Sequence, residues 1–152
     1  MPSRRIWIAL AAGGSAALML AALGFQYIGD MPPCKLCYWQ RYPHWAAIGI
    51  GAVALIVPLA ALTLLGALAA LTTAAIGFYH TGVERGWWEG PASCSGGTAG
   101  LSADDLFEQI MAAPLVRCDE VPWQLFGLSM ASWNMLASLA LAGLWIMAFR
   151  RG

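Results

Sequence analysis

Charged side chains are scarce in this sequence: they make up 11% of its 152 residues, whereas hydrophobic residues make up 60%. A soluble domain is about 25% charged and about 45–50% apolar. The chain therefore lacks the polar surface that a water-soluble globule needs, and its composition favours a protein with lipid as its solvent. It also lacks any basic run, and its formal net charge is zero, which argues against nucleic acid as a partner.

The few charges are unevenly distributed along the chain. Segment 83–122 carries seven acidic residues against two basic ones. The two ends carry basic residues without acidic ones, namely Arg4, Arg5, Arg150 and Arg151. Because an excess of Lys and Arg marks the cytoplasmic side of a membrane protein, both termini are predicted to be cytoplasmic.

Long stretches without charge predict an all-α membrane protein, a bundle of four transmembrane helices in a single domain. A membrane-spanning helix needs roughly 20 apolar residues, and segment 42–81 is long enough for two, with Pro58 marking the turn between them. The predicted helices are residues 6–28, 43–57, 61–80 and 130–149. The loops 29–42 and 83–129 then share one side of the membrane. A cleaved signal peptide is the alternative for the first stretch, but its apolar region is usually only about 7–15 residues long.

A short amphipathic helix is predicted within the second loop. Ser102 and Asp105 form a plausible capping box at its start, and Pro114 ends it. Its apolar face consists of Leu106, Phe107, Ile110 and Met111. Such a helix either lies flat in the membrane interface or packs on the loop itself; the predicted fold includes it as an interfacial helix.

Four cysteines lie outside the predicted spans, on the side where disulfides persist. Cys34 and Cys37 form a C-x-x-C motif, whereas Cys94 and Cys118 lie in the acidic loop. Three interpretations compete: a zinc site with four cysteine ligands, two structural disulfides, or two redox-active pairs. The second pair has no close spacing to match the first, which argues against zinc.

Arg41 follows Cys37 by four residues. If a helix begins near Cys37, the thiol and the guanidinium share a face of it. A helix N-terminus and a nearby cation both lower the pKa of a thiol, and the thiolate is the species that attacks a disulfide. The alternative is that Arg41 extends to the lipid headgroups, as many arginines at the membrane boundary do.

The residues around the C-x-x-C resemble a known family. Cys34-Lys-Leu-Cys37-Tyr-Trp-Gln40-Arg41 is similar to the signature of the bacterial disulfide bond formation protein B family, DsbB. The resemblance continues through Phe78-Tyr-His80-Thr-Gly-Val-Glu84, and through the stretch from Cys118 to Asn134 that leads into the fourth helix. It covers nearly the whole chain, with four cysteines in the expected order.

This resemblance implies a fold and an activity. The fold is a four-helix bundle in the bacterial inner membrane. The activity is that of a protein-dithiol:quinone oxidoreductase, in which a bound quinone, either ubiquinone or menaquinone, receives two electrons. The partner that the resemblance implies is a soluble periplasmic thioredoxin-fold oxidase of the DsbA type, since the DsbA–DsbB–quinone system is what keeps a bacterial periplasm oxidising.

The resemblance also implies a role for each cysteine. Cys94 matches the cysteine that forms a mixed disulfide with the partner protein. Cys118 matches its disulfide mate, which pairs transiently with Cys34. Cys37 matches the cysteine that contacts the quinone.

Two further residues match cofactor-binding positions of the family, and no metal is implied. Arg41 matches the arginine at the quinone, and His80 matches a histidine near it. Trp123 either packs beside the quinone or anchors the loop, and Gln40 lies beside Arg41 without an assigned role.

Two other functions remain open. One is a non-catalytic membrane assembly or chaperone protein held together by two structural disulfides. The other is an enzyme similar to vitamin K epoxide reductase, which carries out related chemistry on a similar bundle.

Overall fold

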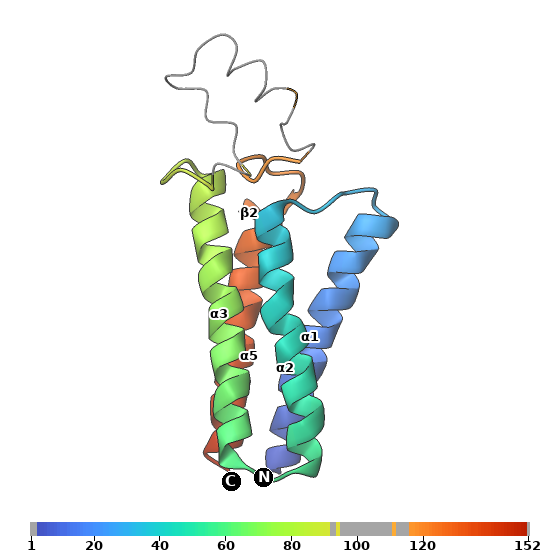
Figure 1. The fold of residues 1–152 in the computed structure, drawn as a ribbon, viewed down its shortest axis with the longest axis vertical. Helices are drawn as coiled ribbons and strands as arrows, with labels where there is room; N and C mark the ends of the chain where they lie inside the picture. Colours follow the sequence, from blue (N-terminus) through green and yellow to red (C-terminus); the bar gives the residue numbers. More distant parts are fainter. Residues whose placement is uncertain (1–2, 92–93, 95–110, 112–115, 152) are drawn as a thin grey trace.

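The computed structural model describes residues 3–91, 94, 111 and 116–151, and these are mostly helical. The described helices are α1 (Arg4–Tyr27), α2 (Lys35–Ile56), α3 (Ala60–Glu84) and α5 (Met130–Phe149). They lie side by side along the long axis of the molecule, with both termini at one end (Figure 1). A two-stranded antiparallel hairpin, β1 (Gln124–Leu125) and β2 (Leu128–Ser129), precedes α5.

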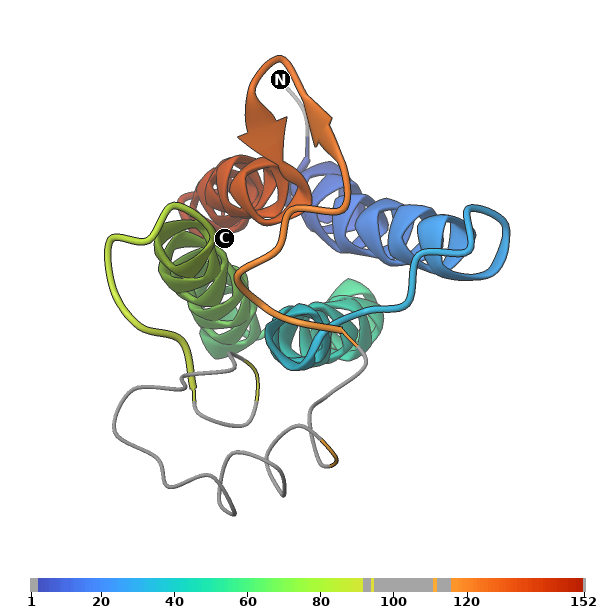
Figure 2. The same ribbon diagram turned by 90° about the horizontal axis from the view of Figure 1, so that it is seen from above.

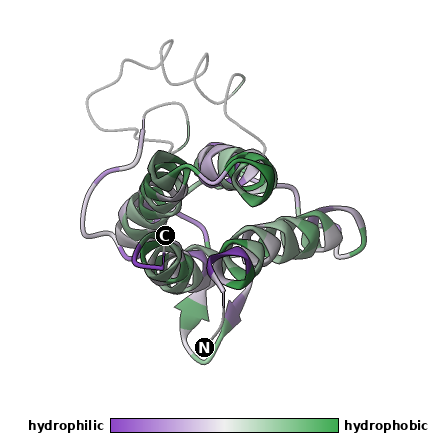
Figure 3. Ribbon diagram, turned by 90° about the horizontal axis from the view of Figure 1, so that it is seen from below, coloured by the Kyte–Doolittle hydropathy of each residue, from purple (hydrophilic) through white to green (hydrophobic). Residues whose placement is uncertain are grey.

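Three of these helices are long and apolar enough to cross a membrane. They are α1, α3 and α5, counted to Arg150. The helix α2 is not among them, and its first two turns carry Lys35, Gln40 and Arg41. Apolar residues run along most of each helix (Figure 3), and large ones point outward, such as Leu20, which is 70% exposed. This outward apolar surface is typical of helices with lipid as their solvent.

Small residues let the helices approach closely, as is typical of membrane bundles. The indole of Trp145 on α5 is fully buried within a cluster that consists mostly of alanines. It lies directly against Gly66 on α3, where an added Cβ would come within 2.5 Å of the indole ring. The contact between α3 and α5 therefore requires glycine at this position.

The opposite ends of the bundle differ in chemistry. At the end with the termini, the guanidinium of Arg4 donates hydrogen bonds to the carbonyls of Pro58 and Leu59, at 3.1 and 2.6 Å, which lie in the turn between α2 and α3. The start of α2, with Cys34 and Cys37, lies at the other end (Figure 1), and Cys94 and Cys118 lie against Cys34 there. Both cysteine pairs therefore lie at the same end of the bundle.

The helix α2 begins at Lys35, not at Pro43 as predicted, so the first loop is shorter than the predicted 29–42. The reason is an N-cap: the side chain of Cys34 accepts a hydrogen bond from the backbone N–H of Cys37. Pro43 lies inside the helix. The helix α3 also continues past the predicted end at His80, to Glu84.

The hairpin is an element that the sequence analysis did not predict. Its two central residues, Phe126 and Gly127, both have positive φ, 52° and 75°, as a tight two-residue turn requires. Viewed from above, the hairpin lies beside the start of α5 (Figure 2). The predicted amphipathic helix falls outside the described residues, apart from Met111.

Candidate functional site

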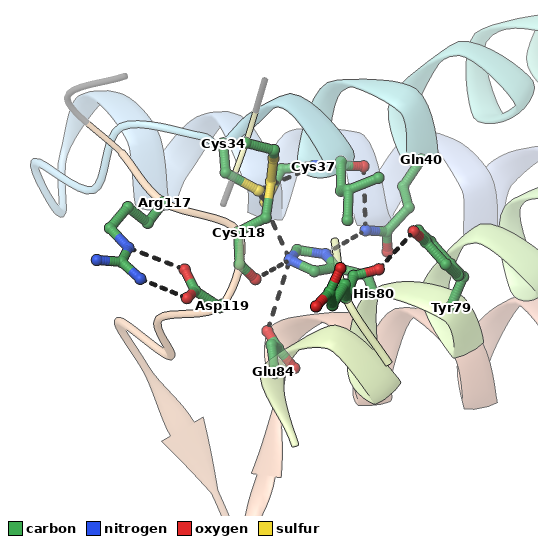
Figure 4. Close-up of a disulfide and its surroundings, with 12 residues drawn as sticks. Cys34, Cys37, Gln40, Tyr79, His80, Glu84, Arg117, Cys118 and Asp119 are labelled. Atoms are coloured by element: carbon green, nitrogen blue, oxygen red, sulfur yellow. Dashed lines mark hydrogen bonds and ion pairs between the residues drawn. A yellow bond between two sulfur atoms is a disulfide. The ribbon is translucent and has the colours of Figure 1, made fainter. Parts of the chain in front are cut away.

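Four cysteines from three segments meet at one end of the bundle. Cys94 and Cys118 form a disulfide. Cys34 and Cys37, at the start of α2, have their Sγ atoms 2.9 Å apart. The Sγ atoms of Cys34, Cys94 and Cys118 all lie within 4.8 Å of one another, and Figure 4 shows Cys34, Cys37 and Cys118 together. The two pairs are therefore close enough for disulfide exchange after small movements.

A shared metal ion is the other chemistry that such a cluster allows. Cys34, Cys37 and His80 also have ligand atoms within 4.8 Å of one another. A metal needs deprotonated thiolates as ligands, whereas Cys94 and Cys118 are bonded to each other. The arrangement thus suits exchange between sulfur atoms better than a four-cysteine metal site.

Cys34 is placed where a negative charge on sulfur is stabilised. It precedes the first turn of α2, and its Sγ accepts from the backbone N–H of Cys37 at 3.3 Å. The hydrogen bond from the Cys37 thiol holds the pKa of Cys34 well below its usual range, against the effect of burial and with the help of nearby His80. The spacing of Cys37 to Arg41 predicted the thiolate on Cys37, but the N-terminus of the helix favours an anion on Cys34.

His80 joins the two pairs. Its Nε2 atom lies 3.6 Å from Cys34 Sγ and 3.1 Å from the carbonyl oxygen of Cys118. The same nitrogen lies 3.8 Å from a carboxylate oxygen of Glu84, one turn later on α3 (Figure 4). Glu84 in turn accepts a hydrogen bond from the hydroxyl of Ser129. The sequence analysis did not single out Glu84, although its spacing of four residues from His80 was a visible signal.

A buried network of polar side chains extends from His80 into the bundle. Gln40 and Asn134 connect it to His44, with heavy-atom distances of 2.8–2.9 Å at each step. These residues come from α2, α3 and α5. His44 and Asn134 were not predicted to be site residues.

A cavity of about 330 Å³ lies between α1, α2 and the start of α5. Cys37 and Arg41 line it, together with Trp123. The guanidinium of Arg41 donates to Gln26 Oε1 at 2.6 Å and lies over the ring of Tyr38. Much of the remaining lining is apolar, including Leu18, Met19, Phe25, Met31 and Pro32.

The structure thus divides the predicted site residues between two adjacent places. The four cysteines come together, and Cys37 and Arg41 both border the cavity. Trp123 also borders it and packs against Phe25, with ring centroids 5.2 Å apart. His80 is not among the residues that line the cavity; its ring contacts sulfur, and its assignment to a quinone stays a prediction.

The chain is similar to one family over nearly its whole length. The sequence model of the family described as Disulfide bond formation protein DsbB matches residues 3–148. Three relatives carry the name Disulfide bond formation protein B. That of Verminephrobacter eiseniae is 35% identical, with 95% of this chain and 84% of the relative covered. Those of Methylococcus capsulatus and Shewanella sp. (strain MR-4) are each 30% identical; the match covers 93% and 89% of this chain, and 91% and 80% of the relatives.

Proposed function

Because this chain belongs to the DsbB family of membrane-embedded disulfide bond formation proteins, we propose that it is a quinone-dependent thiol oxidase. It reoxidises a periplasmic dithiol protein of the thioredoxin fold, of the DsbA type, and passes two electrons to a membrane quinone. One observation carries this proposal: Cys34 lies within exchange distance of Cys94 and Cys118, while its neighbour Cys37 lines a cavity.

The first half of the reaction is exchange between the partner and the Cys94–Cys118 disulfide. A thiolate of the partner attacks Cys94 and releases Cys118 as a thiolate, and the second thiol of the partner then releases Cys94. The partner leaves oxidised, and its two electrons stay on Cys94 and Cys118. Cys94 is 1% exposed, so the residues around it must move apart before a protein can reach it.

The second half passes these electrons to the Cys34–Cys37 pair, which must be a disulfide at the start of this step; in the structure it is a pair of thiols. The Cys118 thiolate attacks Cys34 and releases Cys37, and Cys94 then attacks Cys118 to restore the first disulfide and release Cys34. The short distance between Cys34 and Cys118 supports this path. At its end the two electrons lie on the Cys34–Cys37 dithiol, beside the cavity.

The residues of the cavity fit a quinone ring. Aromatic and aliphatic side chains supply apolar walls, Trp123 supplies a ring face, and Arg41 supplies N–H donors for a ring oxygen. When bound, a quinone supplies the oxidant, which takes up two electrons and two protons. Cys37 and Arg41 are one turn apart on α2, so the guanidinium can stabilise negative charge that develops next to the sulfur.

The proposed topology has four membrane crossings, with α2 as the fourth crossing helix. Arg4, Arg5, Arg150 and Arg151 gather at the end that holds the termini, which supports a cytoplasmic location for that end. The cysteines then face the periplasm at the other end. In this orientation in the bacterial inner membrane, both cysteine pairs face an oxidising compartment.

A turnover assay tests the proposed function. The purified protein is mixed with short-chain ubiquinone and a reduced thioredoxin-fold dithiol protein, and loss of quinone absorbance is followed. We expect turnover in the unaltered protein and none in Cys37→Ser. Full activity of Cys37→Ser would contradict the electron path through the cavity.

A trapping experiment separates this function from that of a protein with two structural disulfides, which the burial of Cys94 would also suit. The partner is supplied with its second cysteine changed to serine, so that no partner thiol can release Cys94 after the remaining partner thiolate has attacked it and displaced Cys118. The mixed disulfide should then accumulate on a non-reducing gel. Absence of any such adduct would favour structural disulfides.

A further inference from the structure

Two histidines on different helices are joined by two side-chain amides. His80 Nδ1 lies 2.9 Å from Gln40 Nε2. Gln40 Oε1 accepts from Asn134 Nδ2 at 2.8 Å, and Asn134 Oδ1 lies 2.9 Å from His44 Nε2. Three of these side chains are buried and that of Asn134 is half-buried. The direction of each hydrogen bond therefore determines which nitrogen of each histidine carries the hydrogen.

The direction at Gln40 is fixed by the backbone. Gln40 Nε2 also lies 3.2 Å from the carbonyl oxygen of Leu36. A carbonyl only accepts hydrogen bonds, so the atom that faces it must be the NH₂ group. The same NH₂ group faces His80 Nδ1, which therefore accepts, and the hydrogen of the neutral ring is on Nε2. His80 thus presents an N–H donor to Cys34 Sγ and to the Cys118 carbonyl.

The direction at Asn134 is fixed independently. The hydroxyl of Thr73 donates its hydrogen to the backbone carbonyl oxygen of Gln40 at 2.9 Å. The Thr73 hydroxyl oxygen therefore acts as the acceptor for Asn134 Nδ2, at 3.1 Å. The NH₂ group of Asn134 therefore faces Thr73 and Gln40, and its oxygen faces His44. An oxygen acceptor requires a donor opposite it, so the hydrogen of the neutral His44 ring is on Nε2.

This assignment leaves the other nitrogen of His44 as a bare acceptor. His44 is 2% exposed, and Nδ1 has no hydrogen-bond partner among the described residues. His44 is among the residues that line the cavity, together with Cys37 and Arg41. A buried polar atom without a partner is unfavourable by about 1–3 kcal/mol, so a ligand that donates a hydrogen bond to Nδ1 would remove this penalty.

We propose that His44 Nδ1 accepts a hydrogen bond from a hydroxyl group of a reduced quinone, and that the cavity for this reason binds the quinol more tightly than the quinone. The inference rests on the proposed function, which places a quinone in this cavity. The oxygens of a quinone only accept, and cannot pair with Nδ1 of the neutral ring. The hydroxyls of a quinol donate. Arg41 offers only donors, and it can serve either form.

A preference for the reduced form has an energetic consequence for the reaction. One hydrogen bond in a buried site corresponds to about a tenfold preference. For a two-electron couple, tenfold tighter binding of the reduced form raises the reduction potential of the bound couple by about 30 mV. His44 would therefore make the bound quinone a stronger oxidant of the Cys34–Cys37 dithiol.

Two substitutions at position 44 separate a ligand contact from a structural role. The amide of His44→Gln reaches the position of Nε2 and keeps a donor to Asn134, but places nothing at Nδ1. The shorter His44→Asn places an oxygen acceptor near the position of Nδ1 and gives up the bond to Asn134. Ser15→Ala is the matched control, since Ser15 is buried in α1 and does not line the cavity.

The measurement is the dissociation constant of short-chain ubiquinone and of its quinol, from quenching of tryptophan fluorescence in the purified full-length protein. Trp123 and Trp133 line the cavity and report on its occupant. We expect the unaltered protein to prefer the quinol, and His44→Gln to lose about tenfold of this preference. His44→Asn should keep most of it, and Ser15→Ala all of it.

The outcomes distinguish this inference from the proposed function. If the unaltered protein binds neither form, both fail. If it binds both forms but His44→Gln shows the same preference as the unaltered protein, only the inference about His44 fails. If His44→Asn loses the preference while His44→Gln keeps it, the role of His44 is to hold Asn134, and the ligand contact is wrong.

Discussion

Gln40 connects three helices with one side chain, so its loss should be measurable in the stability of the bundle. The amide lies on α2, donates to His80 on α3 at 2.9 Å, and accepts from Asn134 on α5 at 2.8 Å. Leucine has a similar size but cannot form hydrogen bonds. Gln40→Leu therefore leaves an acceptor on His80 and a donor on Asn134 without partners in a buried place.

The size of the effect follows from these two contacts. Hydrogen bonds between side chains of neighbouring helices in a membrane average about 0.6 kcal/mol and reach about 1.7 kcal/mol. A buried polar group left without a partner is unfavourable by about 1–3 kcal/mol. With two partners stranded, we expect Gln40→Leu to lower the free energy of unfolding by about 2–4 kcal/mol.

Reversible unfolding in mixed detergent micelles, followed by circular dichroism, would measure this change. Ser15→Ala is the control, because the hydroxyl of Ser15 is buried without a hydrogen-bond partner among the described residues. Its removal leaves no other group without a partner, so it should not lower the free energy of unfolding. If Gln40→Leu is no more destabilising than this control, Gln40 does not hold the three helices together.

Three further predictions concern the sulfur site, the cavity and the helix contacts. In the reduced protein, the lowered pKa of Cys34 keeps this residue a thiolate, with its ultraviolet absorbance, at a pH where a free thiol is protonated. His80→Ala removes one contribution that lowers this pKa, so the thiolate absorbance should disappear at a higher pH than in the unaltered protein. An identical titration would exclude a role for His80. Arg41→Met should weaken binding of short-chain ubiquinone by about 10–100-fold, as loss of a charge-assisted hydrogen bond predicts, and unchanged fluorescence quenching would contradict it. Gly66→Ala forces a methyl group to within 2.5 Å of the Trp145 indole and should lower the free energy of unfolding by about 1–3 kcal/mol in the same micelle assay, whereas an unchanged value would mean that α3 and α5 can separate freely.

The positions of three helices could be predicted because they depend on local composition. A stretch such as 6–28 must be helical in lipid whatever its neighbours are, since its backbone groups have no water to bind. The start of α2 depends on a detail that composition does not reveal. Pro32, Pro33 and Pro43 all suggest breaks, and only the structure shows that the side chain of Cys34 caps the helix before Pro43.

The site divides in a similar way. The cysteines and Arg41 were accessible to sequence reasoning because their chemistry and close spacing are distinctive. The amide bridge was not, because Gln40 and Asn134 are 94 residues apart and neither local sequence points to the other residue. A general signal was nevertheless present: a polar side chain within a membrane segment is costly and usually has a partner, which applies to both His44 and Asn134.

The N-cap at Cys34 also fixes which side chains of α2 lie on the same face. Cys37, Arg41 and His44 are spaced by four and then three residues, so they form a single stripe that faces the cavity. Each residue of an α-helix turns the side chain by about 100°. One residue inserted after Cys37 would leave the cysteines paired but would rotate Arg41 and His44 away from that sulfur. The helical repeat thus keeps the C-x-x-C motif and the ligand-binding residues on the same face of α2. A shift of register alone would separate thiol chemistry from ligand binding without changing any reactive group.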